Sequence, residues 1–295
     1  LFFPAEDGIR ASVASRGLGD VYKRQVPDRD LYALPFAALR DAEGTHLIER
    51  HSVRVAPSIG TLVEREKRRA ATGAAEGKPR SLVVGGVDFD GWTTGDDGTT
   101  HKEQLPGASK EANTVEQLLQ GAGAFEEVNV VKNMCATKPA VVEAMRGSDV
   151  VHLATHGDPE GLFFAAGTSE ADATLSMAEV HALELRRTRL VVLSACDTFK
   201  GELRSDGVVG ITRAFVAAGA RTLVASLWKV DDAATLALMR RFYRELFEDK
   251  DGDVEGDAAV AMRKAMVSML KGAKEQSFSV LQWAAFVVYG LTGGC

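Results

Sequence analysis

Two residues that can act together in chemistry, His156 and Cys196, each follow a short apolar run. His156 ends the run in residues 149–157 (DVVHLATHG), and Cys196 ends the run in residues 189–197 (RLVVLSACD). Short runs of Val and Leu bounded by polar residues are typical of strands buried on both faces of a parallel sheet. The carboxyl ends of such strands meet at one edge, where open α/β sheets carry their sites. We therefore expect the imidazole and the thiol to lie together at that edge.

The chemistry that suits this pair is nucleophilic attack by a thiolate. A free thiol has a pKa of about 8.5, so a nearby imidazole helps it to ionise near neutral pH. The imidazole can then protonate an amine leaving group, and such acid–base help contributes roughly 10²–10⁴ in rate. Gly157 has no Cβ, so the N–H groups of Gly157 and Cys196 are candidates for an oxyanion hole. Spacing alone also allows Cys196 to be a buried apolar residue and His156 part of a turn.

Composition and charge define the broad class of protein. The chain has 295 residues, of which 45% are hydrophobic and 26% charged, and its net charge is −6. These values are typical of a soluble globular protein, and the negative charge argues against nucleic acid as a partner. No apolar run approaches the roughly 20 residues that a membrane-spanning helix needs, so we expect no membrane partner. Three scattered cysteines favour a reducing, cytoplasmic setting over a disulfide framework.

The first 25 residues differ from the rest of the chain. Residues 1–25 have neither helical nor strand periodicity, and they resemble the conceptual translation of sequencing-adaptor DNA joined to a metagenomic reading frame. We set this stretch aside as an artefact, and we expect the natural amino terminus and any upstream domain to be missing. After it we expect an amino-terminal part at 26–78, with an Ala-, Gly- and Lys-rich linker at 70–79, and a catalytic core at 79–295.

Apolar runs alternate with amphipathic stretches along the core. Periodicity and capping residues predict strands at 81–86, 128–131, 150–154, 190–195, 222–226 and 284–288, and helices at 109–119, 137–146, 176–183, 207–218, 232–247 and 257–270. The amino-terminal part is predicted to hold strands at 31–39 and 46–57 and a helix at 58–69. Strands that alternate with helices predict an α/β fold with a mostly parallel sheet covered on both faces.

Metal and nucleotide sites are two alternatives for this region. His152 lies four residues before His156, but a strand places the two side chains well apart, and nothing supplies further ligands at metal-site spacing. We therefore expect no metal and a core or supporting place for His152. The glycines at 85–86 and 207–210 match no phosphate-binding loop, so we expect no nucleotide cofactor. Cys135 and Cys295 have no histidine nearby in sequence and are expected to be inert.

Several segments, in one order, resemble CHAT-domain proteins. They are LPFAALRD, LIERHSVRVAPS, LPGASKEA, VVHLATHG, VVLSACDT, GITRAFVAAGARTLVASLWKVDDAAT and WAAFVVYG. CHAT domains are caspase-like peptidases, related in fold to caspases and separases and often joined to tetratricopeptide repeats. The resemblance implies a caspase-like α/β/α sandwich with a small amino-terminal strand-and-helix appendage. It also implies a His156/Cys196 dyad that cleaves peptide bonds through a thioester, with Gly157 as an oxyanion donor and no metal.

The resemblance also indicates a pocket for the P1 side chain, which precedes the scissile bond. Ser194 stands where caspases carry a glutamine that helps to bind an acidic P1 residue, so we expect no caspase-like preference for Asp. Asp231 and Asp232 can each cap the helix that follows. A similar segment of separases contributes to a pocket for basic P1 side chains, and one carboxylate can serve each role. Trp228 is expected beside this cleft, or in the core alone.

These patterns together predict a regulated cysteine endopeptidase. It is expected to act on a dedicated protein or peptide substrate in bacterial signalling, defence or cell death, under the control of an upstream sensor or repeat domain. Two alternatives stay open. One is an inactive CHAT scaffold that binds partners without cleaving them. The other is a flavodoxin-like binder or thiol transferase, which applies if Cys196 is buried away from His156.

Overall fold

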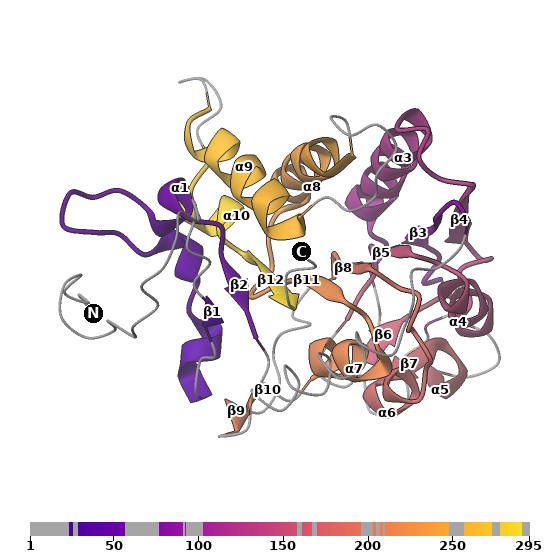
Figure 1. Ribbon diagram of the computed structural model, residues 1–295. Coiled ribbons are helices and arrows are strands. Elements are labelled where there is room, and N and C mark those ends of the chain that lie inside the picture. The colour runs from indigo at the N-terminus through magenta and orange to yellow at the C-terminus, as the bar shows by residue number, and fades with distance from the viewer. Residues whose placement is uncertain are drawn as a thin grey trace.

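A mixed sheet of eight strands forms the centre of the computed structural model, in the order β1–β2–β12–β11–β8–β5–β3–β4 (Figure 1). The structure describes residues 24–25, 29–56, 77–90, 92, 103–157, 161–166, 170–195, 203–204, 207–208, 210–247, 257–272 and 278–290. The strands are β1 (Arg24–Gln25), β2 (Arg54–Val55), β3 (Arg80–Val87), β4 (Glu127–Asn133), β5 (Val150–Leu153), β8 (Leu190–Leu193), β11 (Thr222–Ser226) and β12 (Phe286–Gly290). All pair in parallel except β12 with β11, which is antiparallel.

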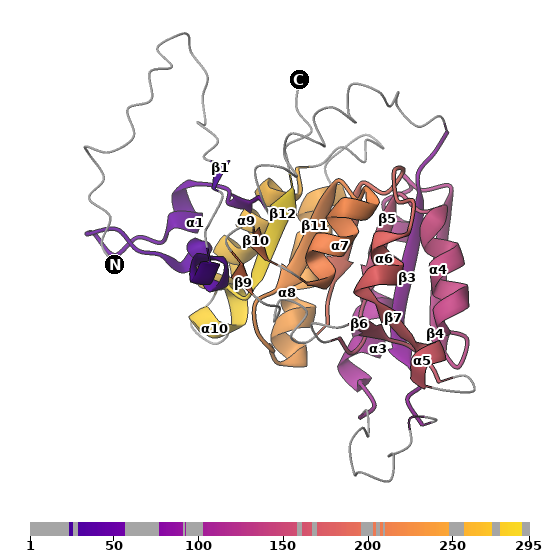
Figure 2. The same ribbon diagram turned by 90° about the horizontal axis from the view of Figure 1, so that it is seen from below.

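Helices cover both faces of this sheet, as Figures 1 and 2 show. One face carries α3 (Pro106–Gly121), α8 (Asp232–Phe247), α9 (Ala258–Leu270) and α10 (Val280–Trp283); the other carries α4 (Lys138–Arg146), α5 (Glu170–Ala173), α6 (Met177–His181) and α7 (Ile211–Ala218). Alternate strand residues face the two layers, because strand side chains point to opposite sides in turn. Leu82 and Val84 pack in one core cluster, and Val83 packs in the other. The α/β class and the mostly parallel sheet are therefore confirmed.

The amino-terminal segment differs from the expected strands. It forms two short 3₁₀ helices, Arg29–Ala33 and Phe36–Ala38, followed by α1 (Leu47–Arg50) and β2. The predictions of strands at 31–39 and 46–57 are thus wrong except at Arg54–Val55. The reason is local hydrogen bonding, because the Glu49 carboxylate accepts the His46 N–H at 2.9 Å and starts a helical turn instead. Residues 57–76, with the predicted helix at 58–69 and most of the predicted linker, lie outside the described residues.

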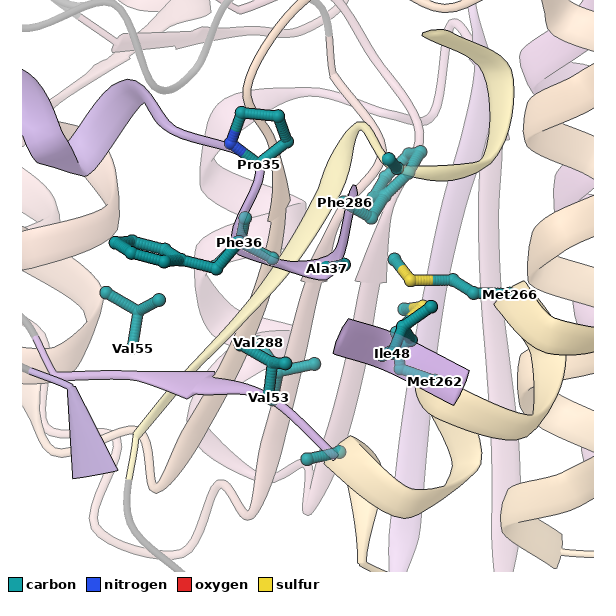
Figure 3. Close-up of a pocket in the computed structure, with 13 residues that line it drawn as sticks. Pro35, Phe36, Ala37, Ile48, Val53, Val55, Met262, Met266, Phe286 and Val288 are labelled. Atoms are coloured by element: carbon teal, nitrogen blue, oxygen red, sulfur yellow. The ribbon is translucent and has the colours of Figure 1, made fainter. Parts of the chain in front are cut away.

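This segment packs against the core along β12 and α9. Val55 pairs with Tyr289, and the Arg263 guanidinium of α9 donates to the carbonyl oxygens of Ile48 and Glu49. Figure 3 shows the pocket at this seam, where Ile48, Met262 and Met266 converge. Every residue that lines it is apolar, so we interpret the pocket as a packing seam rather than a site for chemistry. The predicted division into 26–78 and 79–295 stays a prediction.

Several element boundaries in the core also differ from expectation. The helix expected at 109–119 begins earlier, with Pro106 in its first turn, where the missing proline N–H costs no hydrogen bond. The region after His156 contains an antiparallel pair, β6 (Gly161–Phe163) with β7 (Thr174–Ser176). The helix expected at 207–218 begins later, as α7 at Ile211, because Gly207–Val208 forms the strand β10, which pairs with β9 (Leu203–Arg204). At the other end of the chain, β1 uses Arg24–Gln25, the last two residues of the stretch set aside above; the origin predicted for residues 1–25 stays a prediction.

Asp149 holds the amino ends of β3, β5 and β8 in register. Its side chain is fully buried, and Oδ2 accepts hydrogen bonds of 2.9 Å from the Arg80 N–H and from Arg187 Nε. Arg189 Nε lies 3.6 Å from Oδ1. The Asp149 backbone also bonds to Arg80 on one side and to Arg189 on the other. The carboxylate therefore ties three neighbouring strands together where they start.

Replacement of Asp149 by alanine should lower the free energy of unfolding by about 3–5 kcal/mol, because it leaves buried donors and two arginines without their partner. Urea or guanidinium unfolding at neutral pH measures the change. Glu143→Ala is the matched control, since the Glu143 pair with Arg146 is exposed and should contribute less than about 1 kcal/mol. Equal losses in the two variants would contradict the role given to Asp149.

Candidate functional site

The two predicted reactive positions follow neighbouring parallel strands. Val150 of β5 pairs with Leu190 of β8, and the register holds to Leu153 and Leu193. The two segments stay together past the strands, because the Ser194 N–H donates to the Leu153 carbonyl at 2.9 Å. Cys196 lies outside the described residues, so its predicted role as nucleophile and oxyanion donor stays a prediction.

His156 is half-buried and is oriented by two contacts. Its Nε2 lies 2.7 Å from the backbone carbonyl oxygen of Glu103, and its ring makes an edge contact with Phe89 at 4.8 Å between centroids. A carbonyl oxygen only accepts hydrogen bonds, so Nε2 must carry the proton. In the neutral ring, Nδ1 is then the nitrogen that can take up a proton. The contact therefore selects one tautomer of the imidazole.

The hairpin β6–β7 supports His156 and Gly157 from the other side. The Phe163 N–H donates to the His156 carbonyl at 3.0 Å, and the Thr155 hydroxyl donates to the Phe163 carbonyl. Gly157 faces Leu162 in this bridge, but the bond to Phe163 is made by His156 and not by the Gly157 N–H. The predicted use of Gly157 as an oxyanion donor is compatible with this pairing and stays a prediction.

The two residues before Cys196 are held from three elements. The Ser194 hydroxyl donates to Glu111 Oε2 of α3 at 3.0 Å, and the Ser194 N–H bonds to β5 as described above. The Ser226 hydroxyl at the end of β11 donates to the Ala195 carbonyl at 3.2 Å. Ala195 is buried. The chain that leads to position 196 is therefore fixed by α3, β5 and β11 together.

A cavity opens at this edge of the sheet, beside Ser194 and Ala195. It is lined by Leu105, Ala108, Glu111, Thr155, Ser194, Ala195, Ser226, Trp228, Val230, Asp232, Thr235 and Phe286. Three of the four predicted pocket residues, Ser194, Trp228 and Asp232, are among them, and Asp231 is not. Within the described residues, no cluster of three or more His, Cys, Asp or Glu side chains could hold a metal ion.

Asp231 and Asp232 have different surroundings. Asp231 Oδ1 accepts the Ala234 N–H at 3.0 Å and so caps α8, while Oδ2 accepts from Gln282 Nε2 at 2.9 Å. These hydrogen bonds lower the pKa of Asp231, and the bond from Gln282 has the largest effect. Trp228 Nε1 donates to the Leu281 carbonyl at 2.8 Å, so α10 holds both ends of this loop. Asp231 is thus the helix cap, and of these two aspartates it is Asp232 that lines the cavity.

Gly107 provides the space for Asp232. A Cβ at position 107 would lie 2.0 Å from Asp232 Oδ2 and 2.4 Å from Asp232 Cβ, so a side chain there would displace the carboxylate. The contact places Asp232 against the first turn of α3, where unpaired backbone N–H groups favour negative charge. This explains why the segment LPGASKEA carries a glycine directly after its proline.

Two contributors to the site did not follow from the sequence. One is the backbone carbonyl of Glu103, which no side-chain pattern reveals. The other is Glu111, which is 4% exposed and bonds to Ser194. Its signal was present, because position 111 lies on the same helical stripe as the buried residues Ala108 and Val115. A charged residue on an apolar stripe is a marker of a buried polar site.

Comparison with known proteins identifies relatives of this chain. Residues 25–291 match the family model of the CHAT domain. The chain is 27% identical over 313 residues to tetratricopeptide repeat protein 28 of Homo sapiens and 25% identical over 312 residues to that of Mus musculus. Each alignment covers 90% of this chain and 12% of the relative, so the chain spans a small part of the length of these proteins.

Solved structures that resemble this chain share the caspase-like fold. The Arg-specific cysteine proteinase gingipain R of Porphyromonas gingivalis matches with a TM-score of 0.56 and 14% identity, over 81% of this chain and 53% of that chain. The separase–securin complex of Saccharomyces cerevisiae matches with a TM-score of 0.59 and 14% identity, over 88% of this chain and 15% of that chain. These matches confirm the caspase-like fold. In the described part of this chain, no helix has the length and apolar character needed to cross a membrane.

The cap on α8 yields a stability prediction. Asp231→Ala should lower the free energy of unfolding by about 0.5–2 kcal/mol at neutral pH, whereas Asp231→Asn keeps a capping oxygen and should lower it by less. Because the pKa of Asp231 is lowered in the folded protein, the ionised carboxylate stabilises the fold above the ordinary aspartate pKa. This contribution is lost as the pH falls through the lowered pKa. Denaturant unfolding of the three proteins across acidic pH tests the order; equal stability of the alanine variant and wild type at pH 7 would contradict it.

Proposed function

This chain belongs to the CHAT domain family, and on that premise we propose that it is a cysteine endopeptidase in which His156 and Cys196 cleave peptide bonds. The observation that carries the proposal is the register of β5 and β8. Val150 pairs with Leu190 and Leu153 with Leu193, an offset of 40 residues that also separates His156 from Cys196. Parallel strands in constant register deliver equivalent positions to the same edge of a sheet. The register therefore supports the pairing of these two residues in one site.

The first half of the reaction makes a thioester. Cys196 gives its thiol proton to His156 Nδ1, and the thiolate attacks the carbonyl carbon of the scissile peptide bond. A carbon–sulfur bond forms while the carbonyl electrons move to oxygen, and the Gly157 and Cys196 N–H groups stabilise that oxyanion. When the carbonyl reforms, the carbon–nitrogen bond breaks. His156 Nδ1 donates the proton that it took from Cys196 to the amine nitrogen, and the amine leaves. The tautomer selected by Glu103 supports Nδ1 as the nitrogen that carries this proton.

The second half releases the acid product. A water molecule replaces the amine, His156 Nδ1 takes one of its protons, and the remaining hydroxide attacks the thioester carbon. The second tetrahedral intermediate collapses with loss of the Cys196 sulfur, which regains the proton from His156. No redox partner enters this sequence, because the sole co-reactant is water.

The cavity beside Ser194 and Ala195 is proposed as the pocket for the P1 side chain. Ser194, Trp228 and Asp232 line it, and Asp232 adds a negative charge that suits a basic residue. The name of gingipain R describes it as Arg-specific, which supports a basic P1 residue in a fold of this kind. Asp231, which was predicted together with Asp232, is assigned to the cap of α8 instead.

The biological setting is proposed from the relatives and from composition. The name of tetratricopeptide repeat protein 28 describes a protein with tetratricopeptide repeats. This supports control of the peptidase by an attached repeat or sensor domain. A role in bacterial signalling, defence or cell death, directed at a dedicated protein or peptide substrate, stays a prediction from the sequence resemblance. Cys135 is an exposed free thiol, and this favours a reducing, cytoplasmic setting.

An inactive scaffold is the competing function, and cleavage assays separate the two. The full chain should cleave at least one of the proteins encoded next to it, or members of a peptide library. Cys196→Ala should abolish this cleavage, and His156→Gln should reduce it roughly 10²–10⁴-fold. Cys135→Ala is the control for loss of a thiol and should leave the rate unchanged. Equal cleavage, or none, by the wild type and Cys196→Ala would reject the peptidase function.

A further inference from the structure

Glu111 is a buried carboxylate that faces the cavity described above. It is 4% exposed, it projects from the apolar stripe of α3, and it lines the cavity together with Ser194 and Asp232. Removing a carboxylate from water is costly unless charge partners and hydrogen bonds compensate. The hydrogen-bond and charge partners of Glu111 therefore indicate its role.

The described partners of Glu111 compensate its charge incompletely. Oε2 accepts one hydrogen bond, from the Ser194 hydroxyl at 3.0 Å. Oε1 lies 3.3 Å from His152 Nε2, but the geometry is not that of a hydrogen bond. Among the described residues, no lysine or arginine forms an ion pair with it. Because a carboxylate offers about four lone-pair sites, Glu111 keeps capacity for a cationic donor.

Behind Glu111, a chain of polar groups keeps this carboxylate in place. His152 Nδ1 lies 3.1 Å from the Tyr243 hydroxyl, and both side chains are fully buried. Burial and the charge of Glu111 raise the pKa of Tyr243 well above its usual value, so the phenol stays protonated and donates to Nδ1. The His152 proton then lies on Nε2, on the side of Glu111. His152 and Tyr243 thus pack behind Glu111, with His152 Nε2 3.3 Å from Oε1, and the cavity lies on the other side of the carboxylate.

The remaining walls of the cavity suit a long basic side chain. Leu105, Val230 and Phe286 offer apolar surface to methylene groups, and none of the described side chains that line the cavity is basic. Asp232 adds a second, exposed carboxylate to the lining. Ala195, which also lines the cavity, directly precedes Cys196 in the chain. A Lys or Arg side chain entering here can keep its stem in apolar surroundings and place its charge at Glu111.

We propose that Glu111 is the residue that determines specificity for a basic P1 side chain, by binding the lysine ammonium or arginine guanidinium in the depth of the cavity, with Asp232 in a lesser role. This proposal rests on the peptidase function proposed above. It goes beyond the residues expected from the sequence, because the principal charge comes from α3 and not from the loop that precedes α8.

The test uses peptidyl acyloxymethyl ketones, electrophiles that alkylate a catalytic cysteine and carry a chosen P1 residue. The probes carry arginine, its uncharged isostere citrulline, lysine, acetyl-lysine or norleucine at P1, and mass spectrometry locates the alkylated cysteine. The full-length wild-type chain should be labelled at Cys196 at least tenfold faster by the arginine probe than by the citrulline probe. Lysine should exceed acetyl-lysine in the same way. These comparisons need no variant, so they do not depend on whether a substituted protein folds.

Glu111→Gln removes the charge and keeps the size of the side chain. It should lower the arginine-to-citrulline labelling ratio at least tenfold, while labelling by the norleucine probe changes less than threefold. Glu116→Gln is the matched control. Glu116 lies on the same helix but does not line the cavity, and its carboxylate forms an ion pair with Lys132 at 2.8 Å. The arginine-to-citrulline labelling ratio of this variant should stay at the wild-type value. Asp232→Asn should lower the ratio by less than Glu111→Gln does, because solvent screens the exposed carboxylate.

The outcomes separate the two proposals. Labelling of Cys196 by every probe at similar rates would overturn the specificity proposal and leave the peptidase function standing. An unchanged ratio in Glu111→Gln, or a larger effect from Asp232→Asn, would also overturn it. Failure of all five probes to label Cys196 in the wild type would instead count against the peptidase function on which the proposal rests.

Discussion

The parallel pairing of β5 with β8 is the constraint on which the rest of the structure depends. Asp149 holds the two strands in register where they begin, through hydrogen bonds to β3 and contacts with two arginines. At the opposite edge, the Ser194 N–H continues the pairing beyond β8. A slip of one residue would turn every side chain to the other face, so the buried carboxylate at one edge protects the geometry of the groups at the other.

The two faces of the sheet are packed differently near the site. The layer of α4, α6 and α7 packs against apolar strand residues, and it contributes mainly to stability. Between the sheet and the layer of α3 and α8 lie the buried polar side chains Glu111, His152 and Tyr243, and buried charged groups of this kind contribute little to stability compared with apolar packing. Polar groups in such a place are costly, which fits a purpose other than stability. The cavity lined by Glu111 lies where these groups end.

Much of the core could be predicted from the sequence, since its elements have clear periodicity and caps. The strand Thr222–Ser226 and the helix Asp232–Phe247 begin and end at the predicted residues. The amino-terminal segment could not be predicted, because hydrogen bonds such as that between Glu49 and His46 decide its turns. Within the site, His156 and Cys196 were recognisable from the sequence by residue type and position, whereas the Glu103 backbone carbonyl has no side-chain signature. The burial of Glu111 becomes certain only when α3 is seen against the strands.

The alignment of the strand ends is set by pairing between strands and not by the length of chain that joins them. The crossover from β5 to β8 contains the paired strands β6 and β7 and the short helices α5 and α6. A change in the length of its exposed turns does not by itself move either strand, because the strands are held by their own pairing. The contact of Phe163 with the His156 carbonyl is the part of this crossover that must stay in place beside the strand ends. The spacing of 40 residues between His156 and Cys196 therefore reflects the length of the intervening chain, whereas the alignment of the strand ends comes from their pairing.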